Sequence, residues 1–160
     1  MLSQATNSAE HEEKYITNTA YLSLMVGILF FAQSFENTLA PWLDSYTPIF
    51  YIWSISMGVG LLAMMTFVVL TIMSSNKISR SSYWLLKYDD EFFNYVNSLA
   101  YKWAFNIVIS FLFVCYMLFD AQFIVSETFQ ISELAKLAVG VALFAYGAIV
   151  LFKLKSSNDE

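Results

Sequence analysis

The chain has 160 residues, of which 58% are hydrophobic and only 13% charged, and its net charge is −5 at neutral pH. Soluble domains carry about 25% charged residues, so this composition excludes an ordinary soluble fold. With one histidine, one cysteine and no GxxxxGK[ST] loop, the sequence also lacks the groups for paired-histidine haem, CxxC redox or P-loop nucleotide chemistry. We therefore expect no catalytic residues, no cofactor, no metal site and no enzyme activity.

Four long apolar stretches follow one another along the chain. Each has about 20 residues, the length that a helix needs to cross a hydrocarbon core of about 30 Å. Their continuous apolar character favours helices over the short alternating strands of a barrel. The sequence predicts an all-α integral membrane four-helix bundle with spans at Ile16–Phe35, Ile49–Met73, Leu99–Phe119 and Leu134–Phe152.

The spans pair into two hairpins. The first connection on the outer side holds both prolines, whereas the second, Asp120 to Glu133, has neither proline nor glycine and is expected to form a short interfacial helix. In the inner connector, Tyr83–Tyr88 mixes aromatic residues, leucines and lysine as a segment lying at the membrane surface would. The predicted divisions are a tail (1–15), a hairpin (16–73), a connector (74–98), a hairpin (99–153) and a tail (154–160).

The basic residues predict the orientation. With both termini on the cytoplasmic face, that face carries every lysine and arginine except Lys136. Positively charged loops stay in the cytoplasm, so we expect cytoplasmic termini. We expect a multi-pass protein of the plasma membrane, and its compactness and short loops favour a bacterial inner membrane. The lipid bilayer is its first partner, and the acidic outer loops make nucleic acid an unsuitable one.

Matches between the two halves point to a 2+2 tandem repeat. Tyr15-Ile16-x-x-x-Ala20-Tyr21 recurs 80 residues later as Tyr95-Val96-x-x-x-Ala100-Tyr101. A repeat of two spans keeps its orientation, so the halves would be related by an axis along the membrane normal. In so aromatic a chain such matches also arise by chance, and both interpretations stay open.

A polar ridge marks the third span, where side chains four residues apart share a helix face. Two interpretations apply: a polar track for an ion or a lipid headgroup, or hydrogen bonds to a neighbouring helix with the lysine extending to the inner interface. The ridge consists of Asn94, Ser98, Lys102, Asn106 and Ser110.

Small residues predict helix packing in the second and fourth spans, because they let backbones approach closely. In the fourth span the alanines and the glycines mark two different faces, which suits a central helix or a contact with another protomer. If the contact joins protomers, Gly140→Leu or Ala142→Leu disrupts the assembly. The packing candidates are Ser54, Gly58, Gly60, Ala135, Ala138, Gly140, Ala142, Ala145 and Gly147.

Asp89, Asp90 and Glu91 form an acidic cluster before the third span. We interpret them as capping residues at a helix N-terminus that extends from Asp90 to Phe119, with a cytoplasmic contact as their candidate role. A metal-dependent lipid enzyme is a remote alternative. Consecutive acids on a helix point in different directions, and no second acidic motif completes a site.

The leading hypothesis is therefore a non-enzymatic membrane protein that acts as an accessory, scaffold or regulatory subunit through contacts between helices. We expect it to form a homo-oligomer or to bind another membrane protein. The alternative is a small oligomeric channel or pore lined by Lys102, Asn106 and Ser110. Known four-span families do not fit, since the embedded glutamate of small multidrug exporters and the cysteine pairs of quinone-linked disulfide enzymes are missing.

Overall fold

The computed structural model describes residues 2–35, 48–76, 78, 88–120 and 131–158. Within these ranges the fold is all-α, and 95% of the residues are helical. The helices are α1 (Leu2–Ser34), α3 (Pro48–Ser75), α5 (Glu91–Asp120) and α6 (Ile131–Asn158). Their order along the chain follows the two predicted hairpins.

All four helices are long and apolar enough to cross a membrane. The candidate spans are Ala9–Ser34, Pro48–Ser75, Glu91–Met117 and Ser132–Ser157, with mean hydropathies between 1.5 and 2.2. These lengths and compositions confirm the prediction of four helices that are long and apolar enough to span a membrane. The expected interfacial helix after Asp120 and most of the expected surface segment before Tyr88 lie outside the described residues.

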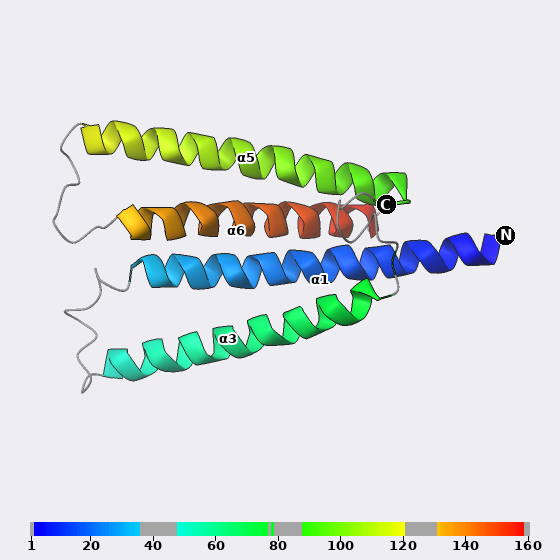
Figure 1. Cartoon of the computed structure of the whole chain (residues 1–160), viewed down its shortest axis with the longest axis horizontal. Helices are drawn as coiled ribbons and strands as arrows, with labels where there is room; N and C mark the ends of the chain where they lie inside the picture. The colour runs from blue at the N-terminus through cyan, green and yellow to red at the C-terminus, as the bar shows by residue number, and fades with distance from the viewer. Residues whose placement is uncertain (1, 36–47, 77, 79–87, 121–130, 159–160) are drawn as a thin grey trace.

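The N-terminal segment differs from the expectation of a tail. Helix α1 begins at Leu2, so most of segment 1–15 is helical and continues the first span without a break. Figure 1 shows this part of α1 projecting past the ends of the other helices. Glu12 and Tyr15 are buried together with Ile16, so the packed part of α1 begins before the predicted apolar stretch.

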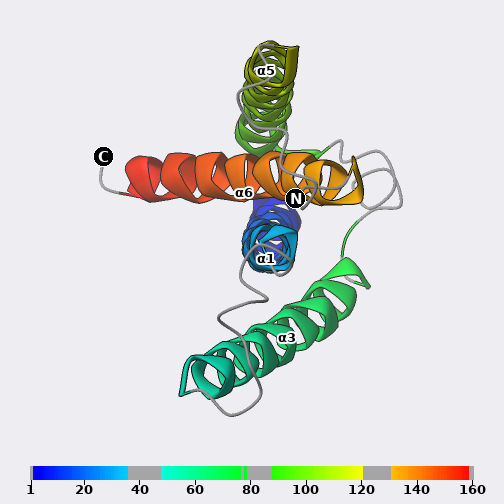
Figure 2. The same cartoon turned by 90° about the vertical axis from the view of Figure 1, so that its left-hand side faces the viewer.

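The helices lie in a row in the order α5, α6, α1, α3 (Figure 1). The most extensive contact joins α1 to α6, and each of these two central helices also packs on one outer helix. Figure 2 shows that α6 crosses α1 and α5 obliquely. A two-fold axis along the membrane normal would pair equivalent helices at the centre. The central pair here is α1 and α6, so the halves do not show that axis.

Two of the matched pairs are nevertheless buried alike, whereas Tyr15 is 4% exposed and its counterpart Tyr95 is 59% exposed. Ile16 and Val96 are both 0% exposed, and so are Ala20 and Ala100. These residues bring α1 and α5 against α6 in one core cluster. The duplication stays a prediction, since equal burial is also what any two helices flanking α6 require.

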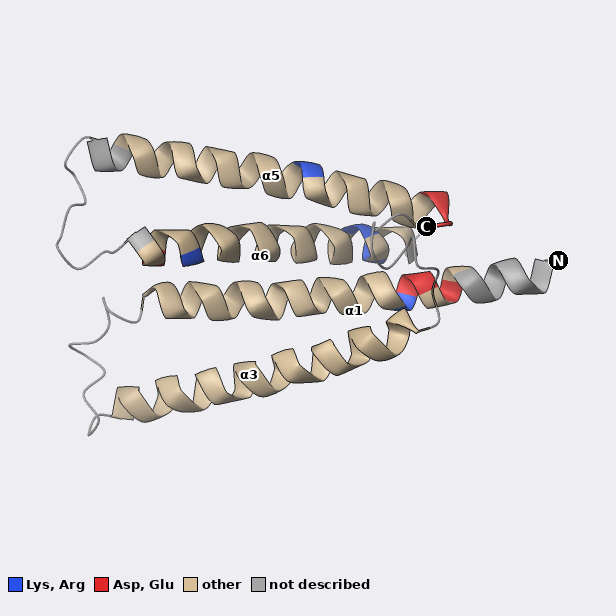
Figure 3. Cartoon of the chain, in the orientation of Figure 1, with Lys and Arg blue, Asp and Glu red and all other residues tan. Residues whose placement is uncertain are grey.

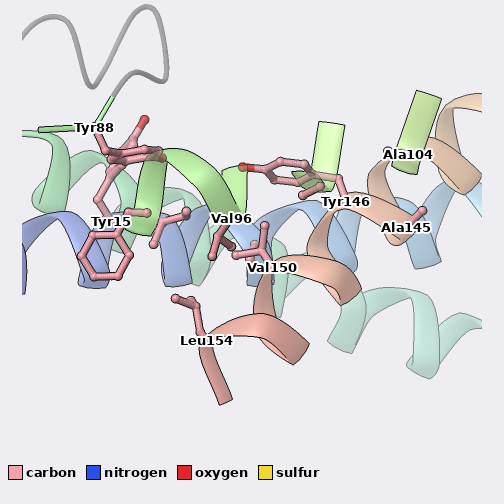
Figure 4. Close-up of a cluster of buried hydrophobic side chains, with 12 residues drawn as sticks. Tyr15, Tyr88, Val96, Ala104, Ala145, Tyr146, Val150 and Leu154 are labelled. Atoms are coloured by element: carbon pink, nitrogen blue, oxygen red, sulfur yellow. The ribbon is translucent and has the colours of Figure 1, made fainter. Parts of the chain in front are cut away.

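The core lies in the half of the bundle nearer the C-terminus and the start of α5. Figure 4 shows Val96 of α5 and Val150 of α6 between Tyr146 on one side and Tyr15 with Tyr88 on the other. Helix α3 contributes only Ser74 as a buried residue. Most of the surface of α3 and α5 is therefore exposed and apolar, which suits contact with lipid tails.

Candidate functional site

Two glycines bring α6 into close contact with α1. A Cβ added at Gly147 would lie 2.5 Å from the carbonyl oxygen of Ala20 and 2.8 Å from Leu24 Cγ. One added at Gly140 would lie 3.1 Å from the carbonyl oxygen of Gly27. The glycine face of α6 therefore packs within the chain. The expectation that Gly140→Leu breaks an assembly of protomers becomes an expectation about folding, because its neighbours are intramolecular.

Gly27 is a packing residue that the sequence interpretation missed. A Cβ at this position would lie 2.8 Å from the backbone nitrogen of Phe144. Ala20 and Gly27 are seven residues apart, the same spacing as Gly140 and Gly147. Because seven residues are close to two helical turns, both pairs lie on one face of their helix. This common spacing in two different spans is the sequence pattern that could have indicated the contact between α1 and α6.

The alanine face of α6 turns toward α5. Ala145 is 7% exposed and belongs to the core cluster that includes Ala104 of α5. Ala142 lines a cavity that α5 also borders. Ala138 is half-buried and Ala135 is exposed, so this contact fades toward the start of α6. Of the two interpretations of this span, a central helix or a contact with another protomer, the observed arrangement agrees with the central helix, since α6 packs between α1 and α5.

The small residues of α3 divide into two groups. A Cβ at Gly60 would lie 2.9 Å from Leu29 Cδ2, which places Gly60 against α1. Gly58 has no heavy atom within 4 Å of such a Cβ, and Ser54 is also exposed. Only Gly60 of this group takes part in packing within the chain.

The polar ridge lies on the outer side of α5. Ser98, Lys102, Asn106 and Ser110 are all exposed, and Asn94 is half-buried. The opposite side of the helix packs on α6 through buried residues that include Ala100 and Ala104. The ridge therefore does not line a channel inside one copy of the chain. It faces whatever surrounds the bundle at this helix.

Lys102 lies deeper within its candidate membrane span than the other described charges lie within theirs. It is eleven residues from Glu91 (102 − 91) and fifteen from Met117 (117 − 102), the ends of the candidate span. Eleven residues correspond to about 16 Å along a helix. Figure 3 shows the charged residues of α1 beside the ends of α3 and α6, and the lysines of α6 near the ends of that helix. Sequence analysis had placed Lys102 near the start of a shorter span.

The acidic cluster caps α5, as its residue types predicted. Asp90 Oδ1 accepts hydrogen bonds from the backbone N–H groups of Phe92 at 2.8 Å and Phe93 at 3.3 Å. A second cap comes from α1, where the buried Glu12 carboxylate accepts the backbone N–H groups of Asp89 at 3.0 Å and Asp90 at 3.1 Å. Sequence reasoning missed Glu12, because a carboxylate 77 residues away gives no local sign of capping.

Asp89 and Glu91 are exposed, so their predicted role in a cytoplasmic contact stays a prediction. Within the described ranges, histidine, cysteine and carboxylate side chains do not gather in groups of three that could hold a metal ion. The geometry of this region is that of a helix start held by two capping carboxylates.

Two polar pairs join helices inside the bundle. Asn18 Nδ2 donates to Ser74 Oγ at 2.8 Å and to the carbonyl oxygen of Leu70 at 3.4 Å, which ties α1 to α3. Tyr146 donates to Asn97 Oδ1 at 2.7 Å, which ties α6 to α5. Such bonds contribute about 0.6–2 kcal/mol between spans. Neither pair was found from the sequence, since each joins spans that only tertiary packing brings together.

A buried hydroxyl group lies beside these pairs at the core. Tyr88 is 4% exposed, and its hydroxyl group has no hydrogen-bond partner among the described residues. Burial raises the pKa of this phenol above its ordinary value, with the nearby tyrosines adding to the effect. The group therefore stays protonated and neutral.

The structure holds two cavities of note. One, of about 320 Å³, is almost wholly apolar and lies between α1, α5 and α6 at the middle of the bundle. The other, of about 250 Å³, is half polar and lies between the start of the candidate span of α1 and the end of α3.

Comparison with family models gives no match, and comparisons with curated proteins and with solved structures also find nothing similar.

Proposed function

We propose that this protein is a non-enzymatic accessory or scaffold subunit of a membrane assembly, and that it binds its partner helix through the outer face of α5. The observation that carries the proposal is the exposure of Ser98, Lys102, Asn106 and Ser110 on one side of this helix.

Polar groups in hydrocarbon require partners. An unsatisfied polar group there costs several kcal/mol, and lysine near the middle of a span costs about 2.5–3.5 kcal/mol on insertion scales. The charge of Lys102 and the amide of Asn106 have lipid as their neighbour if the bundle is alone in the membrane. A partner helix that supplies acceptors, such as a carboxylate opposite Lys102, would remove that cost.

The partner is expected to be helical and to carry polar groups at matching depth. Ser98 and Ser110 let another backbone approach, because small side chains leave room between helices. The apolar residues beside them, such as Phe105 at 65% exposure and Phe113 at 59%, supply area for packing. The partner is a second copy of this chain or another membrane protein, and the mass of the complex distinguishes them.

The test is native mass measurement of the protein purified in mild detergent from its own membrane. The unchanged protein should run as a complex. Lys102→Leu and Asn106→Leu should release a monomer, because each removes a polar group from the proposed contact. Ile52→Leu is the control, since it changes an exposed apolar residue of α3, away from the proposed contact, and should leave the complex intact. Monomers in every sample, or complexes unaffected by both variants, would overturn the proposal.

The pore alternative uses the same face. In an oligomer whose α5 helices surround a central path, Lys102, Asn106 and Ser110 would contact water. Ionic current through the purified protein in a planar bilayer, abolished by Asn106→Leu, would favour the pore and contradict the scaffold. Absence of current together with a disrupted complex would favour the scaffold.

A further inference from the structure

The cavity between α1 and α3 lies at one end of the candidate membrane spans of both helices. Its lining residues Glu10, His11 and Lys14 fall within the first six residues of the candidate span Ala9–Ser34. Its other residues, Leu70, Met73 and Ser74, fall within the last six residues of the span Pro48–Ser75. A cavity placed in this way opens where the headgroups of a bilayer meet its hydrocarbon core.

Packing between the helices forms the base of the cavity. Ser74 is buried, donates to the carbonyl oxygen of Leu70 at 2.7 Å and accepts the amide of Asn18 at 2.8 Å. These bonds hold the end of α3 against α1, so the separation of the two helices at the cavity is set by the fold. Met73 is exposed and Leu70 is half-buried, which gives the lower wall an apolar character.

The upper wall carries groups of both charges. Lys14 supplies a cation and Glu10 an anion, and both are exposed and accessible from the membrane surface. His11 adds a half-buried ring nitrogen that can donate a hydrogen bond. With neutral histidine the formal charges of Lys14 and Glu10 cancel. A balanced site of this kind favours a zwitterion over an anionic ligand.

The end of α3 adds a further negative element. Helix C-termini carry a partial negative charge from carbonyl groups without partners. The last turn of α3 contains no basic residue to offset it. An ammonium group near Glu10 would therefore also be attracted by the end of α3, while a phosphate near Lys14 and His11 would be neutralised by the lysine.

We propose that this cavity binds the headgroup of a zwitterionic phospholipid with a primary ammonium group, of the phosphatidylethanolamine class. Lys14 and His11 contact the phosphate, and Glu10 accepts hydrogen bonds from the ammonium group. The acyl chains lie along Leu70 and Met73 on the outer surface of α3. This lipid lies in the leaflet at the N-terminal end of the bundle.

Lipid retention measured by native mass spectrometry tests the proposal. The purified full-length protein in mild detergent is titrated separately with phosphatidylethanolamine, phosphatidylcholine and phosphatidylglycerol that carry the same acyl chains. Phosphatidylethanolamine should bind most tightly. Quaternary ammonium cannot donate hydrogen bonds to Glu10, and the anionic lipid offers no ammonium group. Equal retention of the three lipids would overturn the proposal.

Two variants should separate the roles of the charges. Lys14→Gln should weaken retention of all three lipids by about tenfold, the change expected for loss of one charge-assisted hydrogen bond. Glu10→Gln should abolish only the preference for phosphatidylethanolamine over phosphatidylcholine. Lys155→Gln, on the exposed surface of α6 near the C-terminal end, is the matched control and should change nothing. A control that behaves like Lys14→Gln would contradict the assignment, as would a Glu10→Gln variant that keeps the preference.

Discussion

Adding one methyl group at Gly147 should destabilise the bundle, because the glycine contact between α1 and α6 leaves no room for a side chain. The added Cβ would lie 2.5 Å from the carbonyl oxygen of Ala20 and 3.0 Å from the backbone nitrogen of Leu24. Both atoms belong to the backbone of α1, so a rotamer change cannot relieve the contact. The two central helices must separate instead.

The magnitude follows from two opposing effects. Alanine is favoured over glycine by up to about 1 kcal/mol in a helix interior. Overpacking a tight contact costs about 1–3 kcal/mol, and more when the obstacle is backbone. We expect Gly147→Ala to lower the free energy of unfolding by about 1–2 kcal/mol. Gly58→Ala is the matched control, since nothing lies within 4 Å of its added Cβ and only the propensity gain remains.

The assay is reversible unfolding in mixed micelles with increasing sodium dodecyl sulfate, followed by far-UV circular dichroism. The free energy of unfolding should fall in Gly147→Ala and rise in Gly58→Ala, so that the two variants differ by about 2–3 kcal/mol. If Gly147→Ala is as stable as Gly58→Ala, then α1 and α6 do not pack through these glycines, and the proposed centre of the row is wrong.

Two further predictions concern hydrogen bonds between the helices. Tyr146→Phe should lower the free energy of unfolding by about 1–2 kcal/mol, because it removes the donor of a buried 2.7 Å bond to α5. Tyr88→Phe should cost nothing, since its hydroxyl has no partner among the described residues, and a loss equal to that of Tyr146→Phe would contradict this geometry. Ser74→Ala should loosen α3 from α1 by removing the acceptor of Asn18 Nδ2, seen as a lower free energy of unfolding in the same assay. Ser75→Ala should not loosen α3 from α1, because the hydrogen bond of the Ser75 side chain stays within α3.

Helix content was predictable because it depends on local composition. Continuous apolar stretches allow only one spanning form, in which each backbone group finds its partner within the same segment. The start of α5 was predictable for the same reason. Asp90 lies directly before the helix, and its carboxylate reaches N–H groups two and three residues later. Such features need no knowledge of distant residues.

The direction of the polar ridge was not predictable. The spacing from Ser98 to Ser110 shows that these residues share a side of α5, but a side can face a neighbouring helix or the surroundings. The buried stripe through Ala100 and Ala104 decides the question, because α6 packs there. On α5, the amide of Asn97 bonds to Tyr146 of α6, and Asn97 lies outside the predicted ridge.

The sequence alone determined that this chain forms four long apolar helices in two hairpins, with few charges within the spans. Only the tertiary structure decided which surfaces are left for partners. It placed α6 between α1 and α5 through Gly140 and Gly147, and turned Lys102 and Asn106 outward. The physical reason is that apolar periodicity specifies a helix but not its rotation. Rotation is fixed by close contacts between small residues on segments far apart in the chain.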